Sequence, residues 1–212
     1  MFDIVFFDCD STLITIESLD ELGKRMGVGD RVSELTKLSM NGDVKIEQVF
    51  KQKIDLMSPR AEDVMVIAAL CREKLVPGAV EVVSFLQRAG KRVFVVSSNF
   101  HAIVDAVADA LGIPPEFVIA NDIYFDERGA YVGINEISPL CRTSGKGEVV
   151  AKLLRDGERS AFVGDGITDA STQGIVDLFI GFGGITMHET VQQKADVYIT
   201  EPNLLSVLKY IE

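Results

Sequence analysis

Short apolar runs rich in Val, Ile and Phe recur along the chain, separated by polar or glycine-containing segments. Each run is almost continuously apolar and does not alternate with polar residues, which is typical of strands covered on both faces of a sheet. Four clear runs and two weaker ones predict strands, at residues 4–7, 92–96, 161–163 and 178–180, and at 117–120 and 197–199.

Segments with a helical spacing of apolar residues lie between these runs, at residues 79–89, 102–111 and 147–154. The first two are followed by Gly90 and Gly112, and glycine commonly ends a helix. This alternation of strands and helices predicts an α/β fold with a doubly wound, mostly parallel, Rossmann-like sheet.

Residues 14–77 interrupt the alternation, because they have helical periodicity and almost no strand pattern. A crossover between parallel strands needs only about a dozen residues or somewhat more. Four helices are expected there, at residues 17–26, 30–40, 45–56 and 59–71. Ser58 is expected to cap the last helix, with Pro59 in its first turn. We therefore expect a helical cap subdomain at residues 14–77, inserted into a core of residues 1–13 and 78–212.

A second interruption, at residues 123–137, alternates around Glu127-Arg128-Gly129. Alternation on both sides of a short glycine-containing segment predicts a β-hairpin. We find no internal repeat and no low-complexity tract.

The composition narrows the classes of partner. The chain has 21 Lys+Arg against 32 Asp+Glu, and the net charge of −11 argues against nucleic acid or an anionic membrane. Three scattered cysteines without a CxxC pair indicate reduced thiols. The longest stretch free of charged residues, 93–104, is too short to span a membrane. The first residues include Asp3 and no basic leader, unlike a secretory signal. We expect a cytoplasmic protein.

Two carboxylates follow the first predicted strand, at the sheet edge where open α/β folds form their sites. Asp8 and Asp10 can both face one site while Cys9 points away as a buried thiol. In one interpretation, one Asp is a nucleophile and the other transfers protons. In the other, the pair only caps a polar loop. Ser11 and Thr12, which supply donors for an anion, favour the first interpretation.

Asp165 and Asp169 follow the predicted strand 161–163 in a glycine-flanked turn. Four acids at neighbouring strand ends would repel one another, since two unit charges about 4 Å apart cost about 1 kcal/mol in water and roughly 4 kcal/mol at an effective dielectric of 20. A divalent cation removes this repulsion. Oxygen ligands without a His or Cys cluster indicate Mg²⁺ and not zinc. We expect no metal role for His101 or His188, which are far apart in the sequence.

Donors for an anion follow a third strand. Ser97, Ser98 and Asn99 come after residues 92–96 and can bind an anion at a helix start, or cap that helix. Lys146 opens another predicted helix, although the helix dipole favours anions at that end. We therefore expect Lys146 to contact a partner outside its helix.

Taken together, these residues resemble a known family. The matching segments are Asp8-Cys9-Asp10-Ser11-Thr12, Ser97, Lys146 and Gly164-Asp165-Gly166 with Asp169. In order and spacing they resemble the four motifs of the haloacid dehalogenase-like phosphatases, and the helical insertion resembles the cap of that superfamily. Within it, the chain is most similar to the phosphoserine phosphatases over nearly its whole length.

The resemblance implies a role for each motif. Asp8 would attack phosphorus and form an aspartyl-phosphate, and Asp10 would protonate the leaving alcohol and then activate water. Ser97 and Lys146 would hold phosphoryl oxygens. Mg²⁺ would be bound by Asp8, the backbone carbonyl of Asp10 and Asp165, with Asp169 in support. These roles suit phosphoryl transfer, which depends mainly on positioning and charge neutralisation.

The resemblance also implies a set of substrate contacts: Glu17, Met40, Lys53, Ser97, Ser98 and Asn99. Some positions depart from the phosphoserine phosphatase pattern. Ser98-Asn99 stands where Gly-Gly is usual, Lys53 where an Arg is usual, and Ile46 where a Phe is usual. Lysine cannot make the planar bidentate grip of arginine on a carboxylate. The overall resemblance makes O-phosphoserine the leading substrate. The departures leave another small phosphomonoester as the alternative.

Two functions of other classes compete with a Mg²⁺-dependent phosphatase. A phospho-accepting signalling domain needs neither the proton donor Asp10 nor an enclosing cap. A silent metabolite binder would be expected to have lost Asp8, Asp10, Lys146 or Asp165, and all four are present. We expect a small phosphorylated metabolite as the partner, no nucleic acid and no membrane, and we make no prediction of the oligomeric state.

Overall fold

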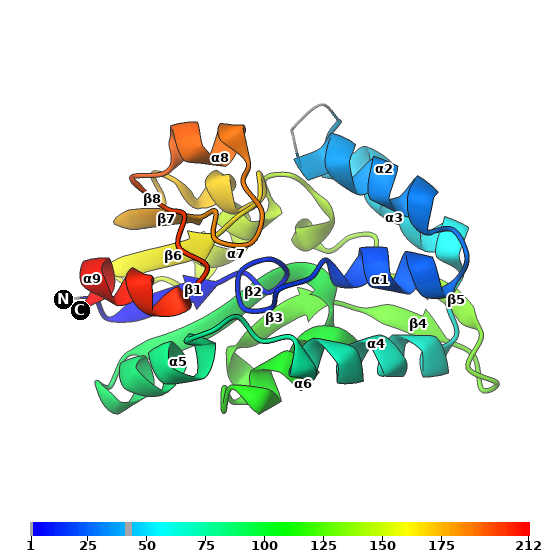
Figure 1. Cartoon of the computed structure of the whole chain (residues 1–212), viewed down its shortest axis with the longest axis horizontal. Helices are drawn as coiled ribbons and strands as arrows, with labels where there is room; N and C mark the ends of the chain where they lie inside the picture. Colours follow the sequence, from blue (N-terminus) through cyan, green and yellow to red (C-terminus); the bar gives the residue numbers. More distant parts are fainter. Residues whose placement is uncertain (1, 41–43) are drawn as a thin grey trace.

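A parallel sheet organises the molecule (Figure 1). The computed structural model describes residues 2–40 and 44–212, and of Met40 the backbone only. Within these residues the sheet has six strands in the order β3-β2-β1-β6-β7-β8, and all neighbouring pairs are parallel. The strands are β1 (Ile4–Phe7), β2 (Arg92–Phe100), β3 (Val118–Asn121), β6 (Ser160–Gly164), β7 (Leu178–Phe182) and β8 (Val197–Ile199).

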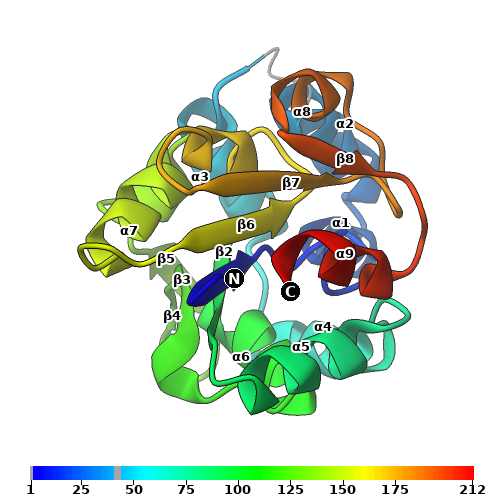
Figure 2. The same cartoon turned by 90° about the vertical axis from the view of Figure 1, so that its left-hand side faces the viewer.

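Helices cover both faces of this sheet (Figure 2), as predicted for a doubly wound fold. Along β1, Val5 and Phe7 pack into one hydrophobic cluster, and Ile4 and Phe6 pack into another on the opposite face. The first cluster includes α5 (Ala79–Arg88), α6 (His101–Ala110) and α9 (Leu208–Ile211); the second includes α7 (Gly145–Leu153) and α8 (Glu189–Lys194). Burial on both faces explains why the strands are continuously apolar.

The four helices expected between the first two strands are present, within two residues of the predicted bounds. They are α1 (Ser18–Arg25), α2 (Gly29–Met40), α3 (Ile46–Met57) and α4 (Ala61–Glu73). The chain enters and leaves this segment side by side, since Thr15 N–H donates to Lys74 C=O and Val76 N–H donates to Leu13 C=O. The helices share a hydrophobic cluster with the sheet. The division into a cap at residues 14–77 and a core stays a prediction.

The predicted start of α4 is wrong. Ser58 does not cap α4; it ends α3 with φ 40°, and its N–H donates to Ile54 C=O at 2.8 Å. Arg60 precedes α4, and its backbone N–H donates to Asp63 Oδ2 at 3.1 Å. Ser58 is thus the C-terminal cap of α3 and not the N-terminal cap of α4.

The predicted hairpin is formed by β4 (Ile123–Phe125) and β5 (Tyr131–Ile134), which pair antiparallel, with Gly129 at φ 73° in the turn. It contacts the helical segment, because Ala61 N–H donates to Gly129 C=O at 2.9 Å and Tyr131 Oη–H donates to Asp55 Oδ1 at 2.9 Å. Short 3₁₀ helices complete the chain: η1 (Pro115–Phe117), η2 (Pro139–Cys141), η3 (Asp169–Thr172) and η4 (Leu204–Val207).

β2 is longer than its apolar run predicts. The strand continues through Phe100, its pairing with β3 shifts register between Val96 and Phe100, and α6 begins at His101. Ser97, Ser98 and Asn99 therefore lie in the strand and not at a helix start, which corrects the prediction. In the part of the chain that the structure describes, no helix has the length and apolar character needed to span a membrane.

Candidate active site

β1 delivers two carboxylates to the carboxyl edge of the sheet. Asp8 continues the pairing of β1 with β6, since its N–H donates to Val163 C=O at 2.9 Å. Asp8 and Asp10 both line the pocket described below. Cys9 between them is fully buried in the hydrophobic cluster on the other side, which confirms that its thiol points away.

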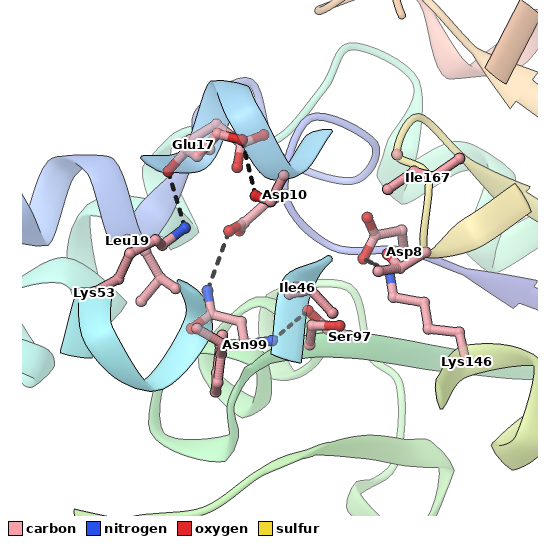
Figure 3. A pocket seen from close by; sticks show the side chains of 16 residues that line it. Asp8, Asp10, Glu17, Leu19, Ile46, Lys53, Ser97, Asn99, Lys146 and Ile167 are labelled. Atoms are coloured by element: carbon pink, nitrogen blue, oxygen red, sulfur yellow. Dashed lines mark hydrogen bonds and ion pairs between the residues drawn. The ribbon is translucent and has the colours of Figure 1, made fainter. Parts of the chain in front are cut away.

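A pocket lies over this edge, and residues of α1, α2 and α3 line part of it (Figure 3). Its cavity volume is about 80 Å³, several times the roughly 10–15 Å³ that one water needs. The lining residues are Asp8, Asp10, Glu17, Leu19, Thr36, Ser39, Ile46, Phe50, Lys53, Ser97, Ser98, Asn99, Lys146, Gly166, Ile167 and Thr168. The pocket thus brings together every predicted substrate contact except Met40, whose side chain lies outside the described residues.

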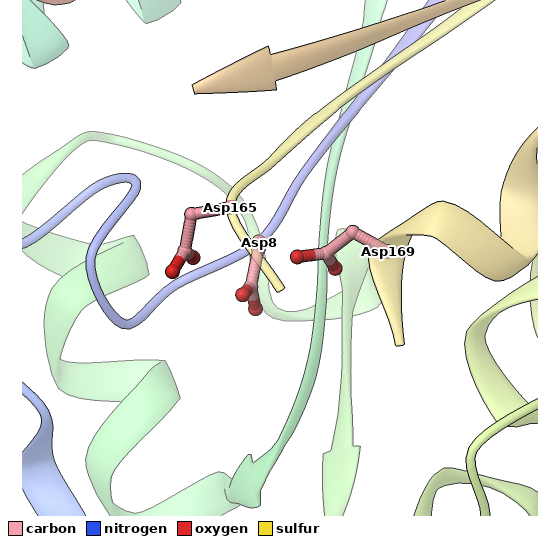
Figure 4. A group of neighbouring side chains, drawn as sticks. All are labelled: Asp8, Asp165 and Asp169. Carbon is pink, nitrogen blue, oxygen red and sulfur yellow. The ribbon is translucent and has the colours of Figure 1, made fainter. Parts of the chain in front are cut away.

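Three carboxylates, those of Asp8, Asp165 and Asp169, lie together beside the pocket (Figure 4), and one ammonium contacts two of them. One oxygen from each of Asp8, Asp165 and Asp169 lies within 4.8 Å of the others. Lys146 Nζ lies 2.6 Å from Asp8 Oδ1 and 2.6 Å from Asp169 Oδ1, so Lys146 does contact partners outside its helix. Burial works against its charge, but Asp169 and Asp8 outweigh burial and raise the pKa of Lys146.

Asp169 is fixed by the turn that follows β6. Its Oδ2 accepts the Gly166 N–H at 2.8 Å. A Cβ on Gly164 would lie 2.3 Å from Asp169 Cγ, so the close packing requires glycine there. Burial and the neighbouring Asp8 raise the pKa of Asp169 from 3.8 to about 7. The ionised carboxylate is thus costly here despite Lys146.

Asp165 has an unmet acceptor. Thr12 Oγ1–H donates to Asp165 Oδ1 at 3.2 Å, while Oδ2 is buried without a hydrogen-bond partner among the described residues. Burial, together with Glu17, Asp8 and Asp169, raises the pKa of Asp165 well above its ordinary value. Clustered hard oxygens with an unsatisfied acceptor fit a divalent cation, which would supply the missing positive charge.

Asp10 differs from this cluster because its partners are uncharged. Its Oδ2 accepts Ser18 Oγ–H at 2.7 Å and Asn99 Nδ2–H at 3.2 Å. Its Oδ1 is buried with no hydrogen-bond partner in the described chain. Burial, followed by the nearby Glu17, raises the pKa of Asp10 well above its ordinary value. One oxygen of Asp10 is thus anchored, and the other is free to carry a proton.

Glu17 and Lys53 line another part of the pocket, with Glu17 close to Asp10 (Figure 3). Glu17 Oε1 accepts Ser11 Oγ–H at 2.6 Å, and Ser11 has φ 52°, so the loop after β1 bends sharply to reach it. Lys53 Nζ donates to Thr36 Oγ1 at 2.9 Å. Burial raises the pKa of Glu17 and lowers the pKa of Lys53. This part of the pocket therefore presents a buried carboxyl group and a buried amine to a ligand.

Sequence reasoning missed several residues of the site. Ser18 and Thr36 orient Asp10 and Lys53 through their hydroxyl groups. His188 Nε2 lies 3.6 Å from Asp165 Oδ2, a proximity that the sequence did not indicate. Burial lowers the pKa of His188. The available signal was the position of His188 after β7, whose carboxyl end lies at the same sheet edge.

The sheet, the acids at its strand ends and the enclosed pocket define an α/β enzyme of the Rossmann-like class. The chain belongs to the haloacid dehalogenase-like hydrolase family, whose model matches residues 2–172. It is therefore a hydrolase.

Relatives with known names agree with this membership. Phosphoserine phosphatase from Bos taurus is 41% identical over 202 residues, covering 94% of this chain and 89% of the relative, and the Homo sapiens enzyme is 40% identical over the same lengths. A solved phospho-aspartyl intermediate analogue of phosphoserine phosphatase is 27% identical with a TM-score of 0.85, covering 100% of this chain and 99% of the other. A substrate-bound phosphoserine phosphatase complex is 26% identical with a TM-score of 0.88, at the same coverage.

Proposed function

We propose that this protein is a Mg²⁺-dependent phosphatase that hydrolyses a small phosphomonoester through an aspartyl-phosphate on Asp8. One observation carries the proposal: Asp8 lines the pocket, 2.6 Å from the buried ammonium of Lys146 and within the cluster of three acids, while Asp10 lines the same pocket. A nucleophile, a cation and a proton donor thus share one enclosed space.

The first chemical step uses Asp8 and Asp10 together. Cys9 N–H and Lys146 Nζ both contact Asp8 Oδ1, so Oδ2 is the oxygen that attacks phosphorus. The new bond joins this oxygen to phosphorus as the bond to the alcohol oxygen breaks. Asp10 gives its proton to the leaving alcohol, which its raised pKa and free Oδ1 favour.

The second step returns the enzyme to its starting state. Asp10, now ionised, accepts a proton from water as the water attacks phosphorus, and the bond between phosphorus and Asp8 breaks. Phosphate leaves, and Asp10 is protonated again. Ser18 and Asn99 hold Asp10 Oδ2 throughout, so the other oxygen keeps its place beside the reacting groups.

Charge neutralisation comes from Lys146, Ser97 and a metal ion. Lys146 and the hydroxyl of Ser97, both buried on the pocket wall, would bind oxygens of the transferred group. Mg²⁺ would be held by Asp8, the Asp10 backbone carbonyl and Asp165, with Asp169 holding Lys146. When bound, it would neutralise charge on the phosphoryl group.

We propose O-phosphoserine as the substrate. The relatives named phosphoserine phosphatase support this choice, and Glu17 and Lys53 are suited to an amine and a carboxylate on one small molecule. A different small phosphomonoester is the second candidate, because Lys53 Nζ is already engaged by Thr36 and a lysine grips a carboxylate less firmly than an arginine. We also propose that the protein is cytoplasmic and that residues 14–77 act as a cap over the site.

The test is hydrolysis of a panel of phosphomonoesters with Mg²⁺ and with a chelator, by the wild type and Asp8→Asn. Phosphoserine should be hydrolysed faster than glycerol phosphate and phosphoethanolamine, and Asp8→Asn should be inactive. No turnover of any substrate, or equal turnover by the wild type and Asp8→Asn, would overturn the proposed phosphatase activity. Equal rates on all three substrates would overturn only phosphoserine as the substrate.

A further inference from the structure

One side chain from each of α1, α2 and α3 belongs to a continuous series of hydrogen bonds that ends in the pocket. Lys53 on α3 donates from Nζ to Thr36 Oγ1 on α2 at 2.9 Å. Thr36 in turn donates from Oγ1 to Asp20 Oδ1 on α1 at 2.6 Å. Lys53 (Figure 3) and Thr36 line the pocket, whereas Asp20 does not. The series therefore connects a carboxylate outside the pocket to an ammonium that lines it.

The direction of this series is fixed, because a hydroxyl group has only one proton to donate. Thr36 Oγ1 directs its proton to Asp20, and to Val32 C=O at 3.0 Å, so its lone pairs are left to accept from Lys53. The Lys53 ammonium has three N–H bonds, and the contact with Thr36 uses one of them. Two N–H bonds thus remain for a ligand in the pocket.

Asp20 also offsets the cost of burying the ammonium. Lys53 and Thr36 are each 7% exposed. Burial lowers the pKa of Lys53, and Asp20, followed by Glu17 and Asp10, acts in the opposite direction. A buried lysine without a nearby carboxylate loses its charge more readily. Asp20 therefore helps to keep a cation in the pocket wall although it does not line the pocket itself.

A lysine needs such support more than an arginine does. Its ammonium is a point charge on a flexible stem, whereas a planar guanidinium binds both oxygens of a carboxylate in a fixed geometry. A side chain that is held in place before the ligand arrives loses less conformational freedom on binding. We propose that Asp20 and Thr36 are positioning residues that hold Lys53 ready for a carboxylate and so select phosphomonoesters that carry one. The inference rests on the proposed function, in which Lys53 contacts the substrate carboxylate, and adds two specificity-determining residues to it.

The experiment measures kcat and KM of the full chain with Mg²⁺ for phosphoserine and for phosphoethanolamine, which lacks the carboxylate. Asp20→Asn removes the charge with little change in size, and Thr36→Val replaces the hydroxyl with a methyl group. Each should raise KM for phosphoserine roughly fivefold, the effect of losing about one hydrogen bond, and leave kcat and the KM for phosphoethanolamine nearly unchanged. Thr36→Ser keeps the hydroxyl and should keep the wild-type KM. Asp30→Asn is the matched control, because Asp30 is exposed on α2 and lies outside the pocket.

A double-mutant cycle with Lys53→Met separates positioning from a purely structural role. Without the ammonium there is nothing to hold, so adding Asp20→Asn to Lys53→Met should not change KM for phosphoserine further. An equal rise in KM for both substrates, an effect that persists in the Lys53→Met background, or an unchanged KM in Asp20→Asn would each overturn the positioning role. If the wild type hydrolyses phosphoserine in those cases, the proposed function stands. If the wild type hydrolyses no phosphomonoester, both fail together.

Discussion

Asp8 and Asp10 come from one loop, yet their surroundings prepare them for opposite tasks. Asp8 faces the ammonium of Lys146 at 2.6 Å, so a cation lies beside the proposed nucleophile. Asp10 faces neutral donors from Ser18 and Asn99, and burial with Glu17 nearby raises its pKa. Two carboxylates whose environments differ in this way are typical of a nucleophile paired with a general acid.

Asp10→Asn tests the proton transfer. Asparagine has nearly the same size but no proton to give, so turnover of phosphoserine should fall by about 10²–10⁴-fold. With p-nitrophenyl phosphate, whose leaving group needs no proton, the first step should stay fast and only release of phosphate should slow. Stopped-flow absorbance should then show a burst of nitrophenolate about equal to the enzyme concentration. Equal losses on both substrates without a burst would show that Asp10 does not act as the acid.

Lys53→Met tests whether the buried amine binds the substrate carboxylate. Lys53 is 7% exposed, lines the pocket and donates to Thr36. Its loss should raise KM for phosphoserine about tenfold and leave KM for phosphoethanolamine, which lacks the carboxylate, nearly unchanged. Lys53→Arg is the matched control and should retain phosphoserine binding. A similar change in KM for both substrates would mean that Lys53 only shapes the pocket.

At the scale of elements, α3 is tied to the loop that leads into α7. Thr143 N–H and Oγ1–H donate to Glu47 Oε2 at 3.0 and 2.9 Å, and Ile46 N–H donates to Thr143 Oγ1 at 3.2 Å. α3 carries Phe50 and Lys53, which line the pocket. These bonds join the start of α3 to the segment just before Lys146, and we expect them to limit opening of the pocket.

Glu47→Gln and Thr143→Val should weaken this closure. A hydrogen bond of this kind contributes about 1 kcal/mol, equal to a roughly fivefold change in an equilibrium. KM should rise several-fold, and amide hydrogen exchange at the start of α3 should accelerate. Glu34→Gln is the control, because Glu34 pairs with Arg31 inside α2 and reaches no core residue in the described chain. Unchanged exchange in both variants would contradict a closing role for these bonds.

The elements that could be predicted from sequence are those whose limits depend on local pattern. The bounds of β1 and β8 match the prediction because their apolar runs stop at polar residues. β2 runs further because pairing with β3, a non-local contact, continues past Val96 into polar residues. Ser58 was expected to cap α4, but it ends α3 instead. A serine followed by proline does not show which of two neighbouring helices the serine belongs to. Local propensity yields to neighbouring structure in both cases.

Part of the site could also be predicted, because some of its residues follow directly from the order of strands and helices. Asp8, Asp165 and Lys146 follow strands or open helices, and parallel topology alone brings their ends together. His188 could not be placed by this reasoning, because its approach to Asp165 depends on the path of residues 183–188 and on Tyr198. Tertiary packing of a loop is not encoded in spacing.

Across the whole molecule, the acidic side chains lie in two different environments. The net charge of −11 is carried mostly by exposed side chains, whereas Asp8, Asp165 and Asp169 are buried together with Lys146 as the neighbouring cation. Buried like charges oppose folding unless they are protonated or neutralised. The cluster therefore links the stability of the whole chain to protons and to a cation.

Mg²⁺ should stabilise the protein more as the pH rises. The pKa of Asp169 is raised from 3.8 to about 7 in the folded chain, so between these values the folded state holds more protons than the unfolded state. Stability without a cation therefore falls across that window, by up to about 1.4 kcal/mol per pH unit for this group. Urea unfolding with Mg²⁺ and with chelator, from about pH 5 to about pH 8, should show a widening difference. Asp165→Asn should abolish it, and the exposed control Asp156→Asn should keep it. A difference that is constant or shrinks with pH would contradict the linkage.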